Sequence, residues 1–328
     1  MVAHVAAQTA PQHVRPFDPR RDLDALATLI QECFGADLAA TGSSMVQEMR
    51  EMALWGPLLG VAQHITPILS GFVWVEEGRL IGNASLTRER EVDGFILSNV
   101  AVTAAYRGRG IASALVDAAI AAARSAGARK IELQVRTGNA LAGGLYARRE
   151  FVHYDTLHEL SVRGSPWPVV LGDPAPTGLR PARWGDGARL YDLVTASTPH
   201  AALRHHPVRR DRYRRGLWWY LGEPWALGME GRARFELVAP AGAGLEAYGC
   251  VTTQLWRGPH ELQLWVRPEA RGRWERPLAE ALFRRIYRAP RHAIRANVSS
   301  SHPEALEALR SLGFETLRIL DQMCLELG

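Results

Sequence analysis

The stretch Tyr-Arg-Gly-Arg-Gly-Ile-Ala-Ser, residues 106–113, decides the fold of the first half of this chain. The run before it, residues 95–102, is apolar enough for a buried strand. The run after it, residues 115–123, is rich in alanine and favours a helix. Gly108 and Gly110 allow the backbone to approach a ligand closely, and the first turn of the helix presents unpaired N–H groups. The sequence therefore predicts an anion-binding turn that suits phosphate.

This turn resembles the acetyl-CoA loop of the GNAT superfamily of N-acetyltransferases. The family pattern is Arg or Gln, two residues, Gly, one residue, then Gly or Ala. Arg107, Gly110 and Ala112 meet that pattern, and Val100-Ala101-Val102 precedes it in strand context. The resemblance implies that acetyl-CoA is the cosubstrate and that its phosphates lie on this turn.

A second motif downstream resembles the Asn…Leu-Tyr…Gly-Phe signature of the same family. Asn139, Tyr146 and Phe151 occur in the required order, with Glu150 in place of the glycine. Together the motifs extend the resemblance over residues 72–162. The residues that the resemblance implies for cofactor binding are Val100, Ala101, Val102, Arg107, Gly108, Arg109, Gly110, Ile111, Ala112, Ser113, Asn139 and Tyr146.

The resemblance also implies a catalytic role for Tyr146, as the acid that protonates the departing thiolate. The alternative for Tyr146 is a half-buried helix tyrosine whose hydroxyl caps a carbonyl group. Asn139 has an alternative role as the N-cap of the helix predicted over residues 140–149. Family members often place a glutamate on the strand that carries Val100, but residues 94–99 contain no carboxylate.

Other carboxylates could act as the general base, but the sequence favours none of them. The candidates are Glu32, Glu89, Glu91 and Asp93. In the family the strand of Val100 separates from its parallel neighbour, and the pantetheine arm lies in the gap. Backbone groups of Val100 and Val102 would then bind the arm, and a backbone N–H would stabilise the oxyanion.

The chain is an internal duplication. Val14-Arg15-Pro16 matches Leu179-Arg180-Pro181, and residues 107–109 match 271–273 at nearly the same offset. Both copies end in a strand-like run, residues 157–162 and 317–327. One duplicated domain explains these matches better than two unrelated domains.

The second copy lacks the residues that the chemistry requires. Trp274 replaces Gly110, and a tryptophan side chain would fill the space that the phosphates need. The further differences from the first copy are Arg276 for Ala112, Pro277 for Ser113, His302 for Asn139 and Leu309 for Tyr146. We therefore expect a non-catalytic second domain with a degenerate CoA site. Its Arg- and Trp-rich segment, residues 201–225, is interpreted as a helix with one basic face and one aromatic core face. The alternatives are an interface and a surface that recognises an acidic or aromatic acceptor.

The predicted fold class is α/β, with two tandem GNAT-like domains, each a mixed and mostly antiparallel sheet flanked by helices. The strand–helix–strand unit over residues 95–135 predicts parallel pairing of its two strands. We place the first domain at residues 12–165 and the second at 178–328. The Pro- and Gly-rich linker between them is placed at residues 166–177.

Composition excludes several classes of function. The chain has 328 residues, a net charge of +5 and no apolar stretch long enough for a bilayer, and we see no secretory signal. Cys33, Cys250 and Cys324 have neither disulfide nor metal spacing, so buried thiols and no metal are expected. A cytoplasmic location fits these features. No nucleic-acid module is recognised, so neither nucleic-acid nor membrane binding is expected.

The leading functional hypothesis is acetyl transfer from acetyl-CoA to the primary amine of a small molecule. A peptide or protein α-amine is a rival acceptor. A CoA-binding regulatory module without turnover is a hypothesis of a different class, which the missing strand glutamate favours. We expect the two domains to pack within one chain, and a homodimer is compatible with the sequence.

Overall fold

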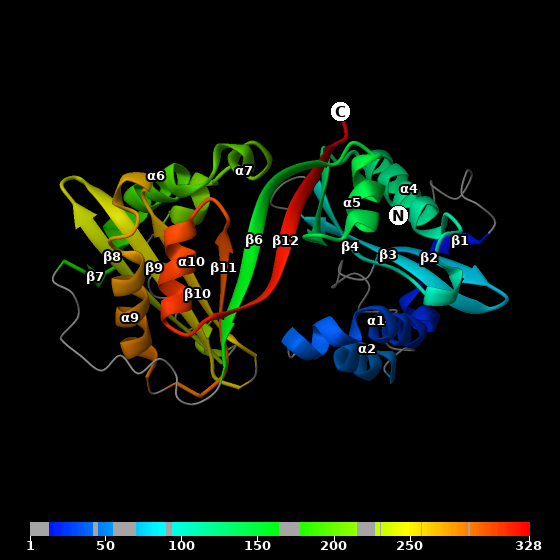
Figure 1. Cartoon of the computed structure of the whole chain (residues 1–328), viewed down its shortest axis with the longest axis horizontal. Helices are drawn as coiled ribbons and strands as arrows, with labels where there is room; N and C mark the ends of the chain where they lie inside the picture. The colour runs from blue at the N-terminus through cyan, green and yellow to red at the C-terminus, as the bar shows by residue number, and fades with distance from the viewer. Residues whose placement is uncertain are drawn as a thin grey trace. The chain divides into compact units, whose positions relative to one another are not determined.

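The computed structural model describes residues 13–41, 45–54, 70–89, 94–163, 178–214, 227–229, 231–256, 258–287 and 289–328. The chain divides into two compact units (Figure 1). Unit 1 contains residues 1–153 and 322–328, and unit 2 contains residues 154–321. Among the described residues, no helix combines the length and the apolar character that crossing a membrane requires.

Unit 1 is built on a mixed sheet with the strand order β1-β2-β3-β4-β5-β12. Its strands are β1 (Val14–Pro16), β2 (Gly71–Glu76), β3 (Arg79–Glu89), β4 (Gly94–Val102), β5 (Lys130–Arg136) and the last residues of β12 (Glu315–Glu326). The pairs from β1 to β4 are antiparallel, whereas β4 and β5 are parallel. The parallel pair confirms the crossover unit that the sequence predicts.

Helices cover both faces of this sheet. They are α1 (Pro19–Thr41), α2 (Met45–Leu54), α4 (Ile111–Ser125) and α5 (Ala140–Ala147). Figure 1 shows α4 and the α1/α2 pair on opposite sides of the strands. Helix α4 buries one apolar stripe, including Leu115, Val116 and Ala119, against core residues such as Leu97 and Ile131. Leucines of α1 form a separate cluster with α2. The core therefore fixes the start of α4 beside the end of β4.

Unit 2 repeats this plan. Its strand order is β6-β11-β10-β9-β8-β7, with β12 beside β6. The strands are β6 (Val152–Val162), β7 (Arg180–Pro181), β8 (Arg232–Ala241), β9 (Gly244–Gln254), β10 (His260–Val266) and β11 (Ile294–Ser299). The helices are α6 (Gly187–Ser197), α7 (His200–His205), α9 (Glu275–Ile286) and α10 (Pro303–Ser311). The parallel pair is β10 with β11, as expected for the copy of β4 and β5.

The duplication extends to individual hydrogen bonds. In unit 1, Arg15 forms a two-pronged ion pair with buried Asp22, at 2.6 and 2.7 Å. In unit 2, Arg180 forms the same pair with buried Asp186, at 2.7 and 2.8 Å. In both copies the carboxylate also accepts a backbone N–H at the start of the following helical segment. Each arginine holds the pKa of its carboxylate below the usual range.

The units differ from the sequence-based domains at their last strands. Residues 154–162 of β6 belong to unit 2, where β6 pairs antiparallel with β11. Residues 322–328 belong to unit 1, where the Leu327 N–H donates to Arg129 O at 2.7 Å. Most of the final strand of the first copy therefore belongs to unit 2, and the last residues of the final strand of the second copy belong to unit 1. Similar apolar strands after similar helices can pair with either sheet, which is why the sequence did not predict this exchange.

Most expected elements within unit 1 lie where the sequence places them. The hairpin turn falls at residues 77–78, and Gly127, at φ 69°, follows the C-terminus of α4. The linker at residues 166–177 lies outside the described residues. In the segment 201–225, the described part contains α7 and a 3-10 turn, Arg210–Tyr213, instead of one continuous helix.

Candidate active site

The turn before α4 has the geometry of an anion site. Gly108 and Gly110 have φ values of 80° and 78°, a left-handed conformation that favours glycine. Gly110 is the N-cap of α4 and has no side chain to cap the helix. Among the described residues, the N–H groups of residues 111–113 have no protein acceptor. A Cβ atom added at Gly108 or Gly110 would meet nothing within 4 Å, so the space above the turn is open.

The two arginines of the turn are exposed and differ in their contacts. The Nε of Arg107 donates to Val102 O at 3.1 Å, which ties the turn to the end of β4. The guanidinium of Arg109 lies over the ring of Tyr106, 4.8 Å from its centroid. Both side chains add positive charge beside the free amides, which suits a pyrophosphate group.

Ahead of this turn in the chain, β4 separates from β5. Their parallel pairing runs from Gly94↔Lys130 to Leu97↔Leu133. β4 nevertheless continues to Val102 and β5 to Arg136. Residues 100–102 therefore lie on the part of β4 that has left its parallel neighbour, as the sequence predicts. An extended ligand can pair with such a free strand edge.

A bulge in β4 accompanies this separation. The register between β3 and β4 shifts between Asn83 and Ser85, and Asn99 adopts a φ of 49°. Asn83 is only 1% exposed, and its Nδ2 donates to Asn99 O at 2.9 Å and to Ser85 Oγ at 3.0 Å. Sequence reasoning missed Asn83, although a polar residue within an apolar strand is a signal for such a role.

We expect Asn83→Leu to destabilise the protein by about 1–3 kcal/mol, because the partly buried Asn99 carbonyl loses its donor. Acetyl-CoA affinity should also fall, because the bulge shapes the free part of β4. Urea unfolding and a binding titration measure the two effects. Ser85→Ala is the control, since it removes the second partner of Asn83 and keeps the bond to Asn99. Unchanged affinity in Asn83→Leu would show that the bulge is irrelevant to the ligand.

Tyr146 lies on α5 and is 6% exposed. Its ring meets Phe151 edge to face, with 5.7 Å between centroids. Burial raises the pKa of Tyr146 to about 12, so the phenol is protonated at neutral pH. Among the described residues, the hydroxyl has no hydrogen-bond partner, so the carbonyl-capping alternative is not observed there. The phenol therefore keeps a proton that it can donate, but its raised pKa makes it a weaker acid than an ordinary tyrosine.

Asn139 is the N-cap of α5, because its Oδ1 accepts the N–H of Ala142 at 3.1 Å. The structure therefore confirms the capping role, and a ligand contact stays a prediction. Glu150 has a φ of 65°, which explains why the family pattern has glycine at this position.

Arg149 connects the two helices of the site, a role that sequence reasoning missed. Its Nε and Nη2 contact the Asp117 carboxylate on α4 at 2.5 and 2.8 Å. It also donates to the carbonyls of Ser113 and Leu145, at 3.1 and 3.0 Å. Arg149 therefore fixes the helix of Tyr146 against the first turn of α4. No local pattern links residues 117 and 149, so only the fold shows this contact.

Helix α1 brings two polar groups to the end of β4. The Cys33 Sγ donates to Val102 O at 3.6 Å, and burial raises the pKa of this thiol. The Glu32 Oε1 accepts the Ala104 N–H at 3.4 Å. Among the candidate bases, Glu32 thus has a described side chain that contacts the segment directly after β4. Glu91 and Asp93 lie outside the described residues, as does the side chain of Glu89.

In the matching turn of unit 2, a carboxylate of the protein accepts a backbone N–H of the turn. Glu275, the first residue of α9, is 1% exposed. Its carboxylate accepts the Trp274 N–H at 3.2 Å and contacts His302 Nε2 at 2.8 Å. Burial alone would raise the pKa of Glu275, but bonds from His302 and from the backbone of Glu275 and Gly272 lower it below its ordinary 4.5. A carboxylate therefore stands where unit 1 has free amides.

The other residues of the unit 2 turn are also bonded within the protein. Arg271 Nη1 donates to Ser301 O at 2.6 Å, and Trp274 Nε1 donates to Glu246 Oε2 at 2.7 Å. Trp274 packs on the apolar core of unit 2. The sequence pointed to Trp274 as the obstruction, whereas the group that the turn amides hold is the Glu275 carboxylate. The available signal was an acidic residue where the first copy has Ile111.

We expect Glu275→Gln to lower the free energy of unfolding by about 1–3 kcal/mol at pH 7, because the variant loses a charged, buried acceptor. Because the pKa of Glu275 is lowered in the folded state, its ionised carboxylate stabilises the fold at pH values above the ordinary pKa of 4.5. This contribution is lost as the pH falls through the lowered pKa. The difference between the two proteins should therefore shrink below about pH 4.5. Urea unfolding at pH 7 and pH 4 measures this, and equal stability at pH 7 would contradict it.

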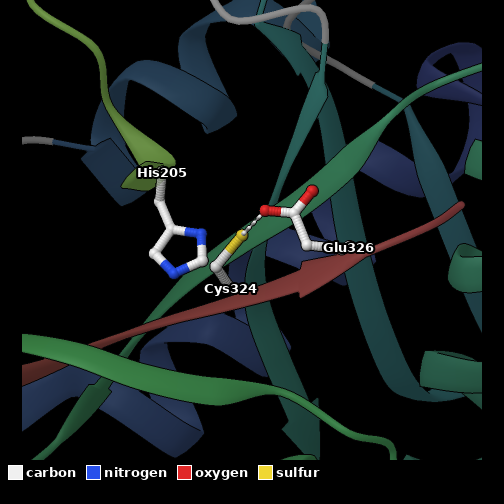
Figure 2. A group of neighbouring side chains, drawn as sticks. All are labelled: His205, Cys324 and Glu326. Carbon is white, nitrogen blue, oxygen red and sulfur yellow. Dashed lines mark hydrogen bonds between the residues drawn. The ribbon is translucent and has the colours of Figure 1, made fainter. Parts of the chain in front are cut away.

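The two most buried thiols have raised pKa values and are not ionised at neutral pH. Burial raises the pKa of Cys250 to about 11 and that of Cys324 to about 12, so both are neutral. Figure 2 shows Cys324 and Glu326 on β12, with the thiol donating to the Glu326 carboxylate at 3.9 Å. Figure 2 also labels His205, the last residue of α7 in unit 2.

A family model matches part of the first half of the chain. Residues 24–151 match the model of the Acetyltransferase (GNAT) family. Among curated proteins, none matches the chain. A GCN5-related N-acetyltransferase from Sphaerobacter thermophilus matches with a TM-score of 0.63 and 17% identity, covering 97% of each chain.

Two further solved structures share the fold. A tandem GNAT protein from the clavulanic acid biosynthesis pathway has a TM-score of 0.56 and 17% identity, covering 96% of this chain and 98% of its own. A glucosamine N-acetyltransferase region of a fungal multi-domain β-N-acetylglucosaminidase has a TM-score of 0.56 and 15% identity, covering 95% of this chain and 38% of the other. These likenesses confirm the mixed α/β fold and its tandem arrangement over the whole chain.

Proposed function

We propose that this chain, which carries a domain of the GNAT acetyltransferase family over residues 24–151, transfers an acetyl group from acetyl-CoA to the primary amine of a small molecule. The observation that carries the proposal is the open turn at residues 107–113, with its free amides and left-handed glycines. The family implies an acyl-CoA donor, and this turn supplies a place for its pyrophosphate.

The geometry of unit 1 supports a single-step transfer. The amine nitrogen attacks the thioester carbonyl carbon, and negative charge develops on the carbonyl oxygen. A backbone N–H on the separated part of β4 can stabilise that charge. The C–S bond then breaks as Tyr146 donates its proton to the leaving sulfur. The attacking nitrogen loses a proton to water, and a proton from water restores the tyrosine. A thiol pKa of about 8.5 makes this acid helpful without making it indispensable.

The acceptor must reach the carbonyl as a neutral amine. An alkyl ammonium has a pKa of about 10.4, so a base or selection of the neutral fraction is required. The side chain of Glu32 contacts the segment directly after β4, where its Oε1 accepts the Ala104 N–H at 3.4 Å. We propose it as the first base to test, by Glu32→Gln.

The experiment is thiol release from acetyl-CoA across a panel of amines. Glucosamine belongs in the panel because one structural relative is described as a glucosamine N-acetyltransferase region. A polyamine, free amino acids and a short peptide with a free α-amine complete it. Release that depends on a small amine supports the proposal, whereas release with the peptide alone would move the acceptor to the peptide class.

A second candidate is a CoA-binding module without turnover. Residues 94–99 of β4 contain no carboxylate, which favours this reading. Tight acetyl-CoA binding without thiol release in the presence of any amine would establish this module and would contradict the transferase proposal. Retention of Tyr146 with an uncommitted hydroxyl supports the enzyme instead.

A further inference from the structure

Unit 2 contains a cavity of about 380 Å³ where β10 separates from β11. The parallel pairing of these strands ends at Leu262↔Ala296, although β10 runs to Val266 and β11 to Ser299. The cavity is lined by residues of β10 and β11 on both sides of this point, by Leu157 and Glu159 of β6, and by residues 197–199 at the end of α6. Unit 2 has therefore kept an open cleft although its anion turn is filled.

The sheet side of the cavity is polar and rich in acceptors. Glu261 and Gln263 come from β10, and Asn297 comes from β11. Among the described residues, these three side chains form no hydrogen bond or ion pair. The hydroxyls at the opposite wall are already committed, because Ser197 and Thr198 donate to carbonyls of α6 at 2.8 and 2.7 Å. The uncommitted groups of Glu261, Gln263 and Asn297 are thus a carboxylate and two carboxamides, all on exposed residues.

The charged side chains that line the cavity include Glu159, Glu261 and Arg295; Glu261 is exposed and lies beside Arg295 in the strand register. The other carboxylate, Glu159, is 8% exposed and pairs with Arg318. It also lies 4.0 Å from the Arg295 guanidinium. No cation pairs with Glu261 in the described part of the chain. Trp265 also lines the cavity, and an indole ring attracts cations.

We propose that this cavity binds a small primary amine in its ammonium form. The carboxylate of Glu261 supplies the opposite charge, the amide oxygens of Gln263 and Asn297 accept the remaining N–H bonds, and Trp265 provides an aromatic wall. A ligand that carries phosphate is disfavoured, because the turn that would hold phosphate already holds the Glu275 carboxylate. The site is separate from the acetyl-transfer site of unit 1 and does not depend on the reaction proposed there.

The test is calorimetric titration of the full chain with glucosamine and with spermidine, without acetyl-CoA. We compare the unaltered protein with Glu261→Gln and with Glu269→Gln. Glu269 is exposed in the same unit and does not line the cavity, so it is a matched control for charge. The N-acetylated form of glucosamine serves as a neutral probe of nearly the same shape.

At least one amine should bind, and Glu261→Gln should weaken that binding at least tenfold, whereas Glu269→Gln should not. The N-acetylated probe should bind at least tenfold more weakly than its parent amine. Binding of neither amine would overturn the proposal. So would equal isotherms for the two variants, because the amine would then occupy another site, such as the acceptor site of unit 1. Because no acetyl-CoA is present, failure here leaves the proposed transferase function intact.

Discussion

Gly110→Trp should reduce acetyl-CoA affinity by a factor of a hundred or more. Gly110 has a φ of 78° and stands as the N-cap of α4, directly before the free amides. The space above it is open, so a large side chain would enter the volume that the phosphates need. The cost to the fold is limited to the left-handed backbone, about 1–2 kcal/mol. A binding titration of acetyl-CoA measures the loss.

The same helix offers a matched control for that strain. Gly127 lies just beyond the other end of α4, has a φ of 69° and also has nothing within 4 Å of an added Cβ. Gly127→Trp should therefore carry a similar stability cost and bind acetyl-CoA normally. If both variants bind equally well, the anion turn is assigned wrongly. If both lose binding, strain alone explains the effect.

Tyr146→Phe should lower kcat roughly a hundredfold and leave acetyl-CoA affinity nearly unchanged. The substitution removes only a hydroxyl that has no partner among the described residues, so the packing against Phe151 is kept. Tyr287→Phe is a suitable control, because that tyrosine is exposed in unit 2. An unaltered kcat in Tyr146→Phe would remove the acid role.

The pH dependence of the reaction adds a second readout for Tyr146. Burial raises its pKa to about 12, so the phenol stays protonated while an amine acceptor loses its proton at about pH 10.4. The rate should rise with pH as neutral amine accumulates, without a falling limb from Tyr146 in that range. A falling limb near pH 8 that disappears in Tyr146→Phe would contradict the raised pKa.

The sequence predicted the local backbone structure around the candidate site, because each element there depends on neighbouring residues. The glycine turn, the helix that follows it and the Asn139 cap are set within a few positions. The separation of β4 from β5 was expected from the family resemblance, and the paired register confirms where it begins.

Contacts between distant residues could not be predicted in this way. One example is the hydrogen bond from Asn83 to Asn99 O, and another is the bond from Arg149 to Asp117. The sequence spacing of these residues follows no helical or strand periodicity. The bond between Glu275 and His302 is of the same kind. In each case the fold brings together two hydrogen-bonding partners from distant segments, and neither residue by itself indicates the contact.

The exchange of final strands shows a different limit. The run at residues 157–162 reads as the last strand of the first copy, yet it pairs with β11 of unit 2. Hydrophobic pattern identifies a strand but does not choose between two similar sheets. Each unit is therefore completed by the other copy, so we expect neither half to be stable when expressed alone at the sequence-based boundaries.

The most direct test of the central claim is a crystal structure of the full chain with acetyl-CoA. We expect electron density for one cofactor, with its pyrophosphate within hydrogen-bond distance of the amides at residues 110–113 and its arm beside residues 100–102. The amides at residues 272–275 should still hold the Glu275 carboxylate. Density for the nucleotide at the unit 2 turn, with the unit 1 turn empty, would contradict the assignment of the cofactor site.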